Sequence, residues 1–450
     1  MTAGRGPVLA VLGAGTAGLE ALLSARQRLP GAQLCLIAPE LTFRYRPIDA
    51  RAPLAPSAER ALPIADLVAE TGAAWVRDRA AAVHPTEREV VTRDGDTVGY
   101  DFLVVAAGAR SRAAVPDGCV WERGHDPAYL DLTIEGILRG RIHHAAIVVP
   151  HGARWSIPAY ELTLVLAWKA AGTRARISLI TAEPAPGAAL GQAAADLIAA
   201  ELADAGVQLR CSDTLRDSDR PDRVISLPAM IGPSLAGLPT DANGFVDVDH
   251  ALRVPGGGRV WAVGGCAAAA LAHSALGARQ ADAAIAQIAA AVSGDDRDGP
   301  PAMPDVSGLL MTGQRERWLA DNPGSRGVST RCLWWPPGRA VGHMLAGRIA
   351  AWDPSSLDRL PERPQGLVIS APVALGAPHQ PVESGEASEA VRTARARDVE
   401  NRQLMAVRRR EREANAELRE LRDRLETFTL EEHEIVRDLE HHGYLTGTHV

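Results

Sequence analysis

Hydrophobic positions near the start of the chain change from one period to another. Residues 8–12 form an apolar run that ends in a Gly-x-Gly-x-x-Gly turn at Gly13, Gly15 and Gly18, after which apolar residues recur at helical spacing. A second apolar run follows at residues 33–38. This pattern predicts a strand, a tight turn, a helix and a second strand.

Each glycine of the turn suits a bound pyrophosphate. Gly13 permits the sharp turn, Gly15 lets a pyrophosphate approach the backbone, and Gly18 lets the helix pack closely on the strand. The free N–H groups of the helix N-terminus, at Thr16 and Ala17, then face the anion. The turn therefore predicts a nucleotide site, and a generic tight turn that opens a buried helix is the alternative.

The end of the second apolar run carries an acidic residue at a suitable distance for a ribose. Glu40 lies 22 residues beyond Gly18. A carboxylate at that point can accept hydrogen bonds from ribose hydroxyls. The glycine turn and Glu40 together favour a dinucleotide over a generic turn.

Short strands are expected in the next part of the chain. Residues 73–105 alternate between apolar and polar positions, and Asp94-Gly95 is a hairpin signal. The last apolar run of this part leads into the small residues Ala107 and Gly108. Small residues at a strand end suit a chain that passes close to a bound cofactor.

Residues 141–216 form a second strand and helix repeat. Two predicted strands alternate with two predicted helices, over residues 141–150, 158–172, 175–183 and 193–207. Between the first strand and helix, the turn has Gly152 as its only glycine and carries Arg154 and Trp155. A pyrophosphate has poor access to such a turn, although Glu183 ends the second strand as a ribose-binding acid would. A Rossmann-like domain without nucleotide and a working NAD(P)H site both stay open.

Residues 240–292 return to the first pattern. They predict a strand and turn region, another strand, a glycine turn at Gly264-Gly265 and a long Ala-rich helix. The helix N-terminus preceded by Gly264-Gly265 directs a second dipole end at a ligand. Residues 301–352 are turn-rich and predict a small third domain or cap.

Composition changes near residue 371. Residues 371–388 are rich in Pro, Gly, Ser and Glu, which is typical of a linker. Beyond them the chain is dense in Arg and Glu, and an apolar seam about two heptads long runs from Ala414 to Phe428. We expect a helical tail that docks on another surface or subunit, and a solvated helix is the alternative.

Charge and cysteine content narrow the function classes. The 48 Lys and Arg residues stand against 55 Asp and Glu, a net charge of −7, so the chain has no basic field for nucleic acid. The five cysteines are far apart and fit a reduced, cytoplasmic protein: Cys35, Cys119, Cys211, Cys266 and Cys332. The first strand begins too early for a signal peptide, and no apolar run is long enough to cross a bilayer. Any membrane contact is expected to be peripheral.

With these segments placed, the chain resembles the two-dinucleotide-binding-domain FAD flavoproteins, and among them the sulfide:quinone oxidoreductases and type II NADH dehydrogenases. The segments that carry the resemblance are VLGAGTAGLEA, YDFLVVAAGAR, PAYELTL and GLPTDANGFVDVD leading to VWAVGGCAAAALAHSALGARQADAA. They cover residues 8–292, and WWPPGR resembles the C-terminal interface segment. The resemblance implies an α/β fold with two Rossmann-like three-layer domains, a small interface domain and the charged helical tail.

The implied domain layout follows from these segments. An FAD-binding domain would consist of residues 1–125 and 236–297, and an NAD(P)-binding-like Rossmann domain with a degenerate turn of residues 126–235. An interface domain would cover 298–370, a linker 371–388, and the tail 389–450.

The resemblance also implies which residues hold FAD: Gly13, Gly15, Thr16, Ala17, Gly18, Glu40, Arg46, Pro47, Ala80, Ala107, Gly108, Gly264 and Gly265. The first turn and Glu40 would hold the adenosine and pyrophosphate, and Ala80 would lie by the adenine. Arg46 and Pro47 would lie near the isoalloxazine.

Three positions depart from the family pattern. Gly265 stands where the family has an Asp, and Ala107 where Thr is usual. Losing a charged hydrogen bond costs about 1.5–3 kcal/mol, which FAD can survive through its other contacts. Trp155 occupies the position of a cysteine that the sulfide-oxidising branch needs, so sulfide chemistry is not expected.

Two residues are candidates for catalysis. Cys266 follows the glycine pair and could lie near the cofactor, although a buried structural thiol is the alternative. His273 could face the flavin pyrimidine edge as a cation that stabilises reduced flavin, although a structural histidine is the alternative.

The expected function is an FAD-dependent oxidoreductase. It would pass electrons from NAD(P)H, a doubtful donor here, or from another two-electron donor through flavin to a quinone-like or protein acceptor. The alternative is a catalytically weakened scaffold whose tail, residues 389–450, mediates assembly with a partner protein or as a homo-oligomer. No metal site is expected.

Overall fold

The computed structural model describes residues 6–45, 60–116, 118–121, 127–268, 271–294, 306–312, 316–322, 325–329 and 343–352. The chain divides into two compact units, Met1–Leu375 and Gly376–Val450, and all the described residues belong to the first. Arg46, Pro47, the predicted linker and the predicted charged tail lie outside the described residues.

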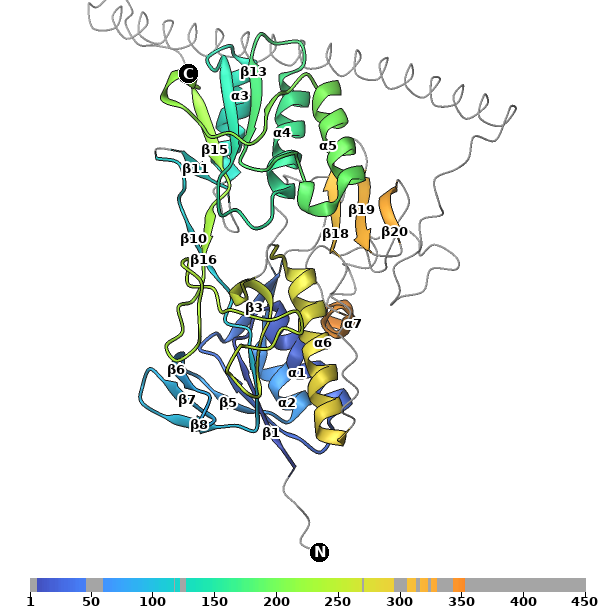
Figure 1. Ribbon diagram of the computed structural model, residues 1–450. Coiled ribbons are helices and arrows are strands. Elements are labelled where there is room, and N and C mark those ends of the chain that lie inside the picture. Colours follow the sequence, from blue (N-terminus) through green and yellow to red (C-terminus); the bar gives the residue numbers. More distant parts are fainter. Residues whose placement is uncertain are drawn as a thin grey trace, which may run out of the picture. The chain divides into compact units, whose positions relative to one another are not determined.

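A five-stranded parallel sheet forms the base of the first domain (Figure 1). Its strands, in spatial order, are β17 (Val260–Ala262), β9 (Phe102–Val105), β1 (Val8–Leu12), β2 (Gln33–Ile37) and β5 (Ala74–Val76). The chain passes from β1 to β2 on one side and later adds β9 on the other side of β1, so the winding direction reverses between β1 and β9. Ligands of doubly wound sheets bind at that point, beyond the carboxyl ends of the strands.

Both faces of this sheet are covered. Leu9 and Val11 of β1 pack towards the helices α1 (Thr16–Arg28) and α6 (Ser274–Ser293). The alternate residues Ala10 and Leu12 pack into a second cluster that includes the antiparallel sheet on the other face. That sheet consists of β6 (Ala80–His84), β7 (Glu89–Thr92) and β8 (Thr97–Gly99). A continuous apolar run such as Val8–Leu12 is what a strand buried on both faces requires.

The hairpin expected at Asp94-Gly95 is confirmed. This pair lies in the turn between β7 and β8, which pair antiparallel. Gly95 has a φ of +93°, a left-handed conformation that glycine adopts without strain.

A second parallel sheet follows the same plan. Its order is β11 (Cys119–Val120), β15 (Arg223–Ser226), β12 (His144–Val149), β13 (Arg176–Thr181) and β14 (Gln208–Arg210). The helices of this domain are α3 (Pro127–Leu138), α4 (Ile157–Ala170) and α5 (Gln192–Asp204). The predicted alternation of strand and helix is therefore confirmed. The strands β10 (Arg110–Arg112) and β16 (Ala229–Ile231) pair antiparallel and join the two domains.

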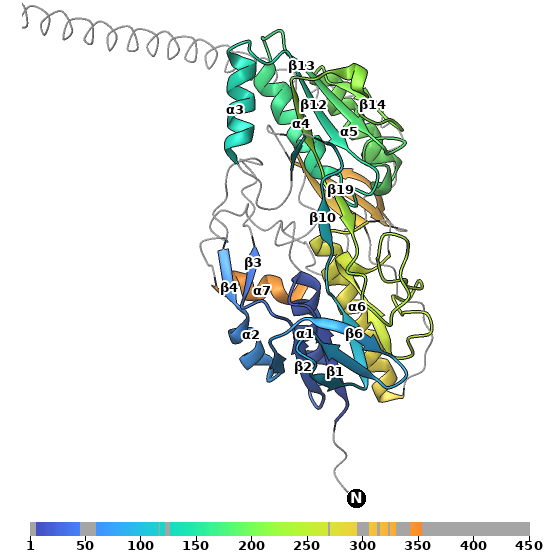
Figure 2. The same ribbon diagram turned by 90° about the vertical axis from the view of Figure 1, so that its left-hand side faces the viewer.

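The segment after residue 300 divides its packing between the two domains. The antiparallel strands β18 (Val306–Met311), β19 (Glu316–Asn322) and β20 (Ser325–Ser329) contribute Leu310 and Leu319 to the core of the second domain. Buried Glu161 of α4 accepts a hydrogen bond of 2.8 Å from the Met311 N–H. In contrast, α7 (His343–Trp352) packs on α1 of the first domain (Figure 2). The described part of this segment has no hydrophobic cluster of its own.

The small hairpin of the first domain pairs β3 (Thr42–Tyr45) with β4 (Arg60–Pro63), and the helix α2 (Ile64–Thr71) follows it. Throughout the stretches that the structure describes, no helix combines the length and apolar character needed to cross a membrane.

The strand and turn region expected over residues 241–254 forms turns and isolated β-bridges, in which the carboxylates of Asp241 and Asp249 accept nearby backbone N–H groups. One expectation for residues 240–292 needs correction, because the last helix does not begin directly after the glycine pair. Gly264–Cys266 forms a single 3-10 turn, and α6 begins at Ser274 with His273 as its N-cap.

Candidate cofactor-binding site

The first glycine turn lies at the point where the first sheet reverses direction. Gly13 has a φ of +105°, and its N–H donates to the Ile37 carbonyl at 2.9 Å. A Cβ on Gly13 would lie 2.4 Å from the Ala106 carbonyl oxygen, and one on Gly18 would lie 1.9 Å from the Gly13 oxygen. Both positions therefore exclude any side chain.

Gly15 differs from its two neighbours in the motif. A Cβ at Gly15 would meet no atom of the described chain within 4 Å, and its φ of −77° is open to any residue. Gly15 is the N-cap of α1, and the first N–H groups of a helix have no partner within that helix. Gly15 is exposed, and Thr16 and Ala17 are half-buried. The helix end thus offers backbone donors and open space to an anion.

Two further segments of small residues, Ala107–Gly108 and Gly264–Gly265, lie against the first glycine turn. We call Gly264–Gly265 the third glycine turn. A Cβ on Gly264 would lie 3.1 Å from the Ala17 Cβ. A Cβ on Gly265 would lie 3.4 Å from the Cα of Gly108 and 3.3 Å from the Ala109 nitrogen. The structure therefore brings together, at one edge of the sheet, segments that are far apart in the sequence. Ala107, half-buried, precedes Gly108 at the end of β9.

Glu40 and Ala80 lie on one side of this convergence. Glu40 is exposed, three residues beyond the end of β2, and its carboxylate lies 3.7 Å from the guanidinium of Arg79. Arg79 directly precedes Ala80, the first residue of β6. The ion pair connects the two loops that the sequence assigned to the adenosine end. Because both partners are largely exposed, it adds little to stability.

Cys266 is a buried thiol beside the glycine turn. Its Sγ lies 3.2 Å from the carbonyl oxygens of both Val105 and Val263. Burial raises the pKa of the thiol. A protonated thiol that faces two carbonyls favours a structural role over a nucleophilic one.

His273 is the N-cap of α6 and contacts one residue of each domain. Its Nδ1 accepts the Leu276 N–H at 3.4 Å, and its ring lies against the indole of Trp155 with centroids 4.1 Å apart. Burial, together with the positive charge of Arg279, lowers the pKa of His273 to about 3. The imidazole is therefore neutral near pH 7, which favours the structural alternative over a cation at this position. Its Nε2 is buried without a hydrogen-bond partner among the described residues.

Comparison with known proteins places this geometry in a fold. No family model and no curated protein matches the sequence. The sulfide:quinone oxidoreductase from the hyperthermophilic bacterium Aquifex aeolicus has a similar structure, with a TM-score of 0.62 at 18% sequence identity. The match covers 79% of this chain and 93% of that chain. The chain has the fold of the two-domain flavoproteins.

Two further flavoprotein structures match less well. A ferredoxin reductase from Rhodopseudomonas palustris has a TM-score of 0.49 at 19% identity, over 71% of this chain and 83% of its own. Putidaredoxin reductase, in a covalent complex with putidaredoxin, has a TM-score of 0.49 at 18% identity, over 72% of this chain and 83% of its own.

The turn between β12 and α4, residues 150–158, corresponds in the second domain to the first glycine turn, and we call it the second turn. The acidic residue beside it is hydrogen-bonded by side chains of its own domain. Glu183, the acid placed for a ribose, accepts hydrogen bonds from Ser156 at 2.9 Å, from Thr181 at 3.2 Å and from the Tyr160 hydroxyl. Arg154 is 8% exposed and turns towards the first domain. The sequence presents Arg154 and Trp155 as obstacles to a pyrophosphate and does not predict their contacts with residues more than 100 positions away.

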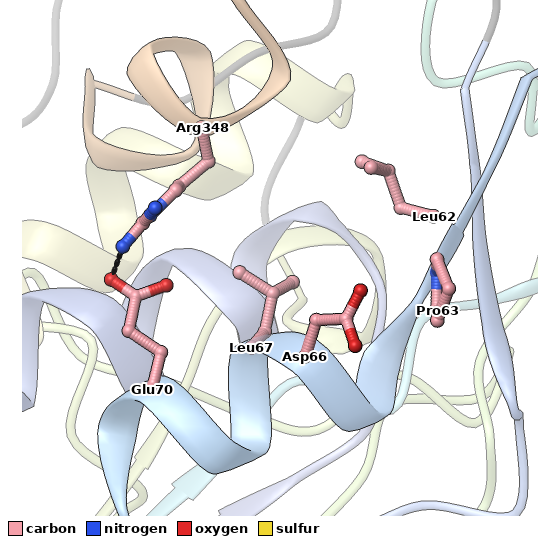
Figure 3. Close-up of a pocket in the computed structure, with 6 residues that line it drawn as sticks. All are labelled: Leu62, Pro63, Asp66, Leu67, Glu70 and Arg348. Atoms are coloured by element: carbon pink, nitrogen blue, oxygen red, sulfur yellow. Dashed lines mark ion pairs between the residues drawn. The ribbon is translucent and has the colours of Figure 1, made fainter. Parts of the chain in front are cut away.

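A pocket of about 360 Å³ lies elsewhere, between β4, α2 and α7 (Figure 3). Arg348 reaches from α7 to form an ion pair with Glu70 of α2, and Asp66 lies on the same helix. None of the residues predicted to bind a cofactor lines this pocket. The pocket marks the docking of α7 on the first domain. In the described ranges, no cluster of His, Cys, Asp and Glu is arranged to hold a metal ion.

Proposed function

We propose that this protein is an FAD-dependent oxidoreductase that binds FAD at its first glycine turn. The observation that carries the proposal is the convergence of Gly13–Gly18, Ala107–Gly108 and Gly264–Gly265 at the reversal point of the first sheet. Open space at Gly15 beside the N-terminus of α1 fits a pyrophosphate. Bound FAD would supply the redox chemistry, and the protein would orient it.

Residues on either side of the first glycine turn would contact the two ends of FAD. Glu40 and Ala80 would lie at the adenosine, and the Gly264-Gly265 turn at the ribityl chain. Arg46 and Pro47 stay assigned to the isoalloxazine by resemblance alone. Gly265 supplies no carboxylate, so we expect FAD to bind about 10 to 150 times more weakly than it would with a charged hydrogen bond there.

The electron donor is proposed to be something other than NAD(P)H. Glu183 is engaged by Ser156, Thr181 and Tyr160, and Arg154 leaves the turn for the other domain. Anaerobic mixing with NADH or NADPH should therefore reduce the flavin slowly or not at all. Rapid bleaching would show that the second turn accepts a nucleotide. A quinone-like compound or a protein is the proposed acceptor.

The FAD site can be tested with a substitution that blocks the open space. Gly15→Val should leave the fold intact, because its Cβ meets nothing within 4 Å. It should weaken FAD binding by roughly 100-fold, since the side chain occupies the approach to the backbone. FAD affinity is measured by quenching of flavin fluorescence.

A matched control separates the site from the fold. Gly31→Val changes another exposed glycine of the same domain, again with no atom within 4 Å of the new Cβ. It should bind FAD like the wild type. Unchanged FAD affinity in the Gly15→Val protein, or no FAD binding by the wild type, would overturn the proposed function.

The second candidate is a scaffold that has lost turnover. The glycine at position 265 and the internally satisfied Glu183 favour it. The proposed tail, residues 389–450, would then bind a partner or a second copy of the chain. Removing residues 386–450 distinguishes the two: an enzyme keeps flavin and turnover, whereas a scaffold loses its assembly and never shows turnover.

A further inference from the structure

Two backbone carbonyls of the third glycine turn point to one side chain of the other domain. The guanidinium of Arg154 donates to the Gly265 oxygen at 2.9 Å and to the Ala267 oxygen at 2.8 Å. These residues are 111 and 113 positions from Arg154 in the sequence. A planar guanidinium can hold two acceptors at once in a fixed geometry.

The surroundings of Arg154 hold the guanidinium in place. Its Cζ lies 4.2 Å from the centroid of the Phe245 ring, so the charge stacks on an aromatic face. Burial of an arginine is costly unless its donors are engaged. The two carbonyls and the ring therefore repay a large part of the desolvation of a side chain that is only 8% exposed.

The contact extends along the chain on both sides. The Ala272 N–H donates to the Arg154 carbonyl at 3.0 Å, and the Trp155 indole packs on His273. Two residues of the second turn therefore contact the first domain at Gly265, Ala267, Ala272 and His273. We call Arg154, Trp155 and these contacts the clasp.

The clasp acts on a turn that contains two successive glycines. Gly264 has a φ of +71° and Gly265 follows it, so two successive residues lack side chains that would limit the backbone. The Gly264 N–H donates to Gln280 at 2.7 Å, which holds one end of the turn. The carbonyls at Gly265 and Ala267, which define the other end, are held by Arg154.

We propose that Arg154 is a positioning residue for FAD, and that the turn of the second domain serves the first nucleotide site rather than a nucleotide of its own. The inference rests on the proposed function. Arg154 fixes the turn so that Gly265 stays against Gly108, the arrangement in which the glycine segments face one ligand. The second domain would thus preorganise the cofactor site through the clasp.

The test compares FAD affinity in Arg154→Met and Arg154→Lys with the wild type. Loss of two charged hydrogen bonds to the turn should weaken FAD binding roughly 10-fold to 100-fold in Arg154→Met. Arg154→Lys keeps the charge but loses the planar guanidinium that binds both carbonyls. Its affinity for FAD should therefore lie between that of the wild type and that of Arg154→Met. If Arg154→Met does not fold, Arg154→Lys decides, and wild-type FAD affinity in that variant overturns the proposal.

The control removes an arginine whose hydrogen-bond partners lie in the second domain. Arg210 donates to Asp213, Asp219 and the Thr214 carbonyl. Arg210→Met should lower the melting temperature of the apoprotein and leave FAD affinity unchanged. If Arg154 has only a structural role, the loss of FAD affinity in each Met variant should be proportional to the decrease in the melting temperature of its apoprotein. That result would overturn the proposal.

The two failures can be told apart. A wild-type protein that binds no FAD removes both the proposed function and the role of Arg154. A wild type that binds FAD while Arg154→Met binds it equally well removes only the positioning role.

Discussion

Burial decides what Cys266 and His273 can do at the scale of single residues. A thiol loses reactivity when its pKa rises, and an imidazole loses its charge when its pKa falls. Burial drives both shifts. The sequence proposed both residues as candidates for catalysis, Cys266 as a thiol near the cofactor and His273 as a cation facing the flavin. Each is uncharged near pH 7, so any catalytic part they play is that of a neutral group.

Cys266 should resist alkylation in the folded protein. Its thiol is fully buried and faces the carbonyls of Val105 and Val263. Iodoacetamide should label it only after unfolding, as read by mass spectrometry of tryptic peptides. The half-exposed Cys119 and Cys211 provide the internal comparison. Rapid labelling of native Cys266, with loss of flavin reduction in Cys266→Ala, would contradict a structural role.

Protonation of His273 in the unfolded chain should lower the free energy of unfolding as the pH falls. Its pKa is 6.5 in a free side chain and about 3 in the folded protein. Above pH 6.5 neither state binds the proton, so the site has no effect. Below pH 6.5 the unfolded chain binds a proton that the folded chain cannot hold until about pH 3. The free energy of unfolding should therefore fall by about 1.4 kcal/mol per pH unit from this site alone.

The measurement compares urea unfolding of the wild type and His273→Asn between pH 6.5 and pH 4. Asn can still cap α6, so the variant removes the titration and keeps the cap. The wild type should lose stability more steeply than the variant. Parallel curves for the two proteins would show that His273 is protonated in the folded state.

A buried carboxylate fixes the position of α7 at the scale of elements. Glu20 of α1 is fully buried and accepts the Met344 N–H at 2.7 Å and the Leu345 N–H at 2.8 Å. These groups lie at the N-terminus of α7, where a negative charge is favourable. The exposed ion pair of Glu70 and Arg348 lies further along the same interface.

Glu20→Gln should therefore release α7 more readily than Glu70→Gln. Removing a buried charged cap costs about 1.5–3 kcal/mol, whereas a surface ion pair contributes about 0–1 kcal/mol. Limited trypsin digestion, followed at the Arg348 site, measures the opening of α7. Equal cleavage rates in the two variants would show that Glu20 does not hold the helix.

At the scale of the whole molecule, local pattern predicted the sheets but not their contacts. Apolar runs such as Val8–Leu12 and His144–Val149 became parallel strands, because a strand buried on both faces needs a continuous apolar run. The glycine turn at residues 13–18 followed from the same local signal. The glycine pair does not supply the dipole end of α6, because Gly264–Cys266 forms a separate 3-10 turn, whereas the position of His273 near the start of that helix is confirmed.

The clasp could not be predicted, because its partners are distant in sequence. Arg154 donates to backbone carbonyls, and because every residue has one, the accepting residues cannot be recognised from their side-chain type. The neutrality of His273 depends on burial against Trp155 from the other domain, which no local pattern encodes. The sequence predicted that the turn after β12 suits a nucleotide poorly, and the hydrogen bonds that Glu183 accepts within its own domain favour that prediction.

The two parallel sheets therefore have unequal roles. One carries an open glycine turn at its reversal point. At the equivalent turn of the other, Glu183 is hydrogen-bonded by side chains of its own domain and Arg154 reaches to the first domain. We therefore propose that the chain binds one dinucleotide, FAD, at the first turn.

Equilibrium dialysis of the purified full-length protein against FAD, NADH and NADPH tests that claim most directly. We expect one FAD per chain, loss of that binding in Gly15→Val, and no saturable binding of NADH or NADPH. Absence of FAD binding, or an NADH stoichiometry equal to that of FAD, would contradict it.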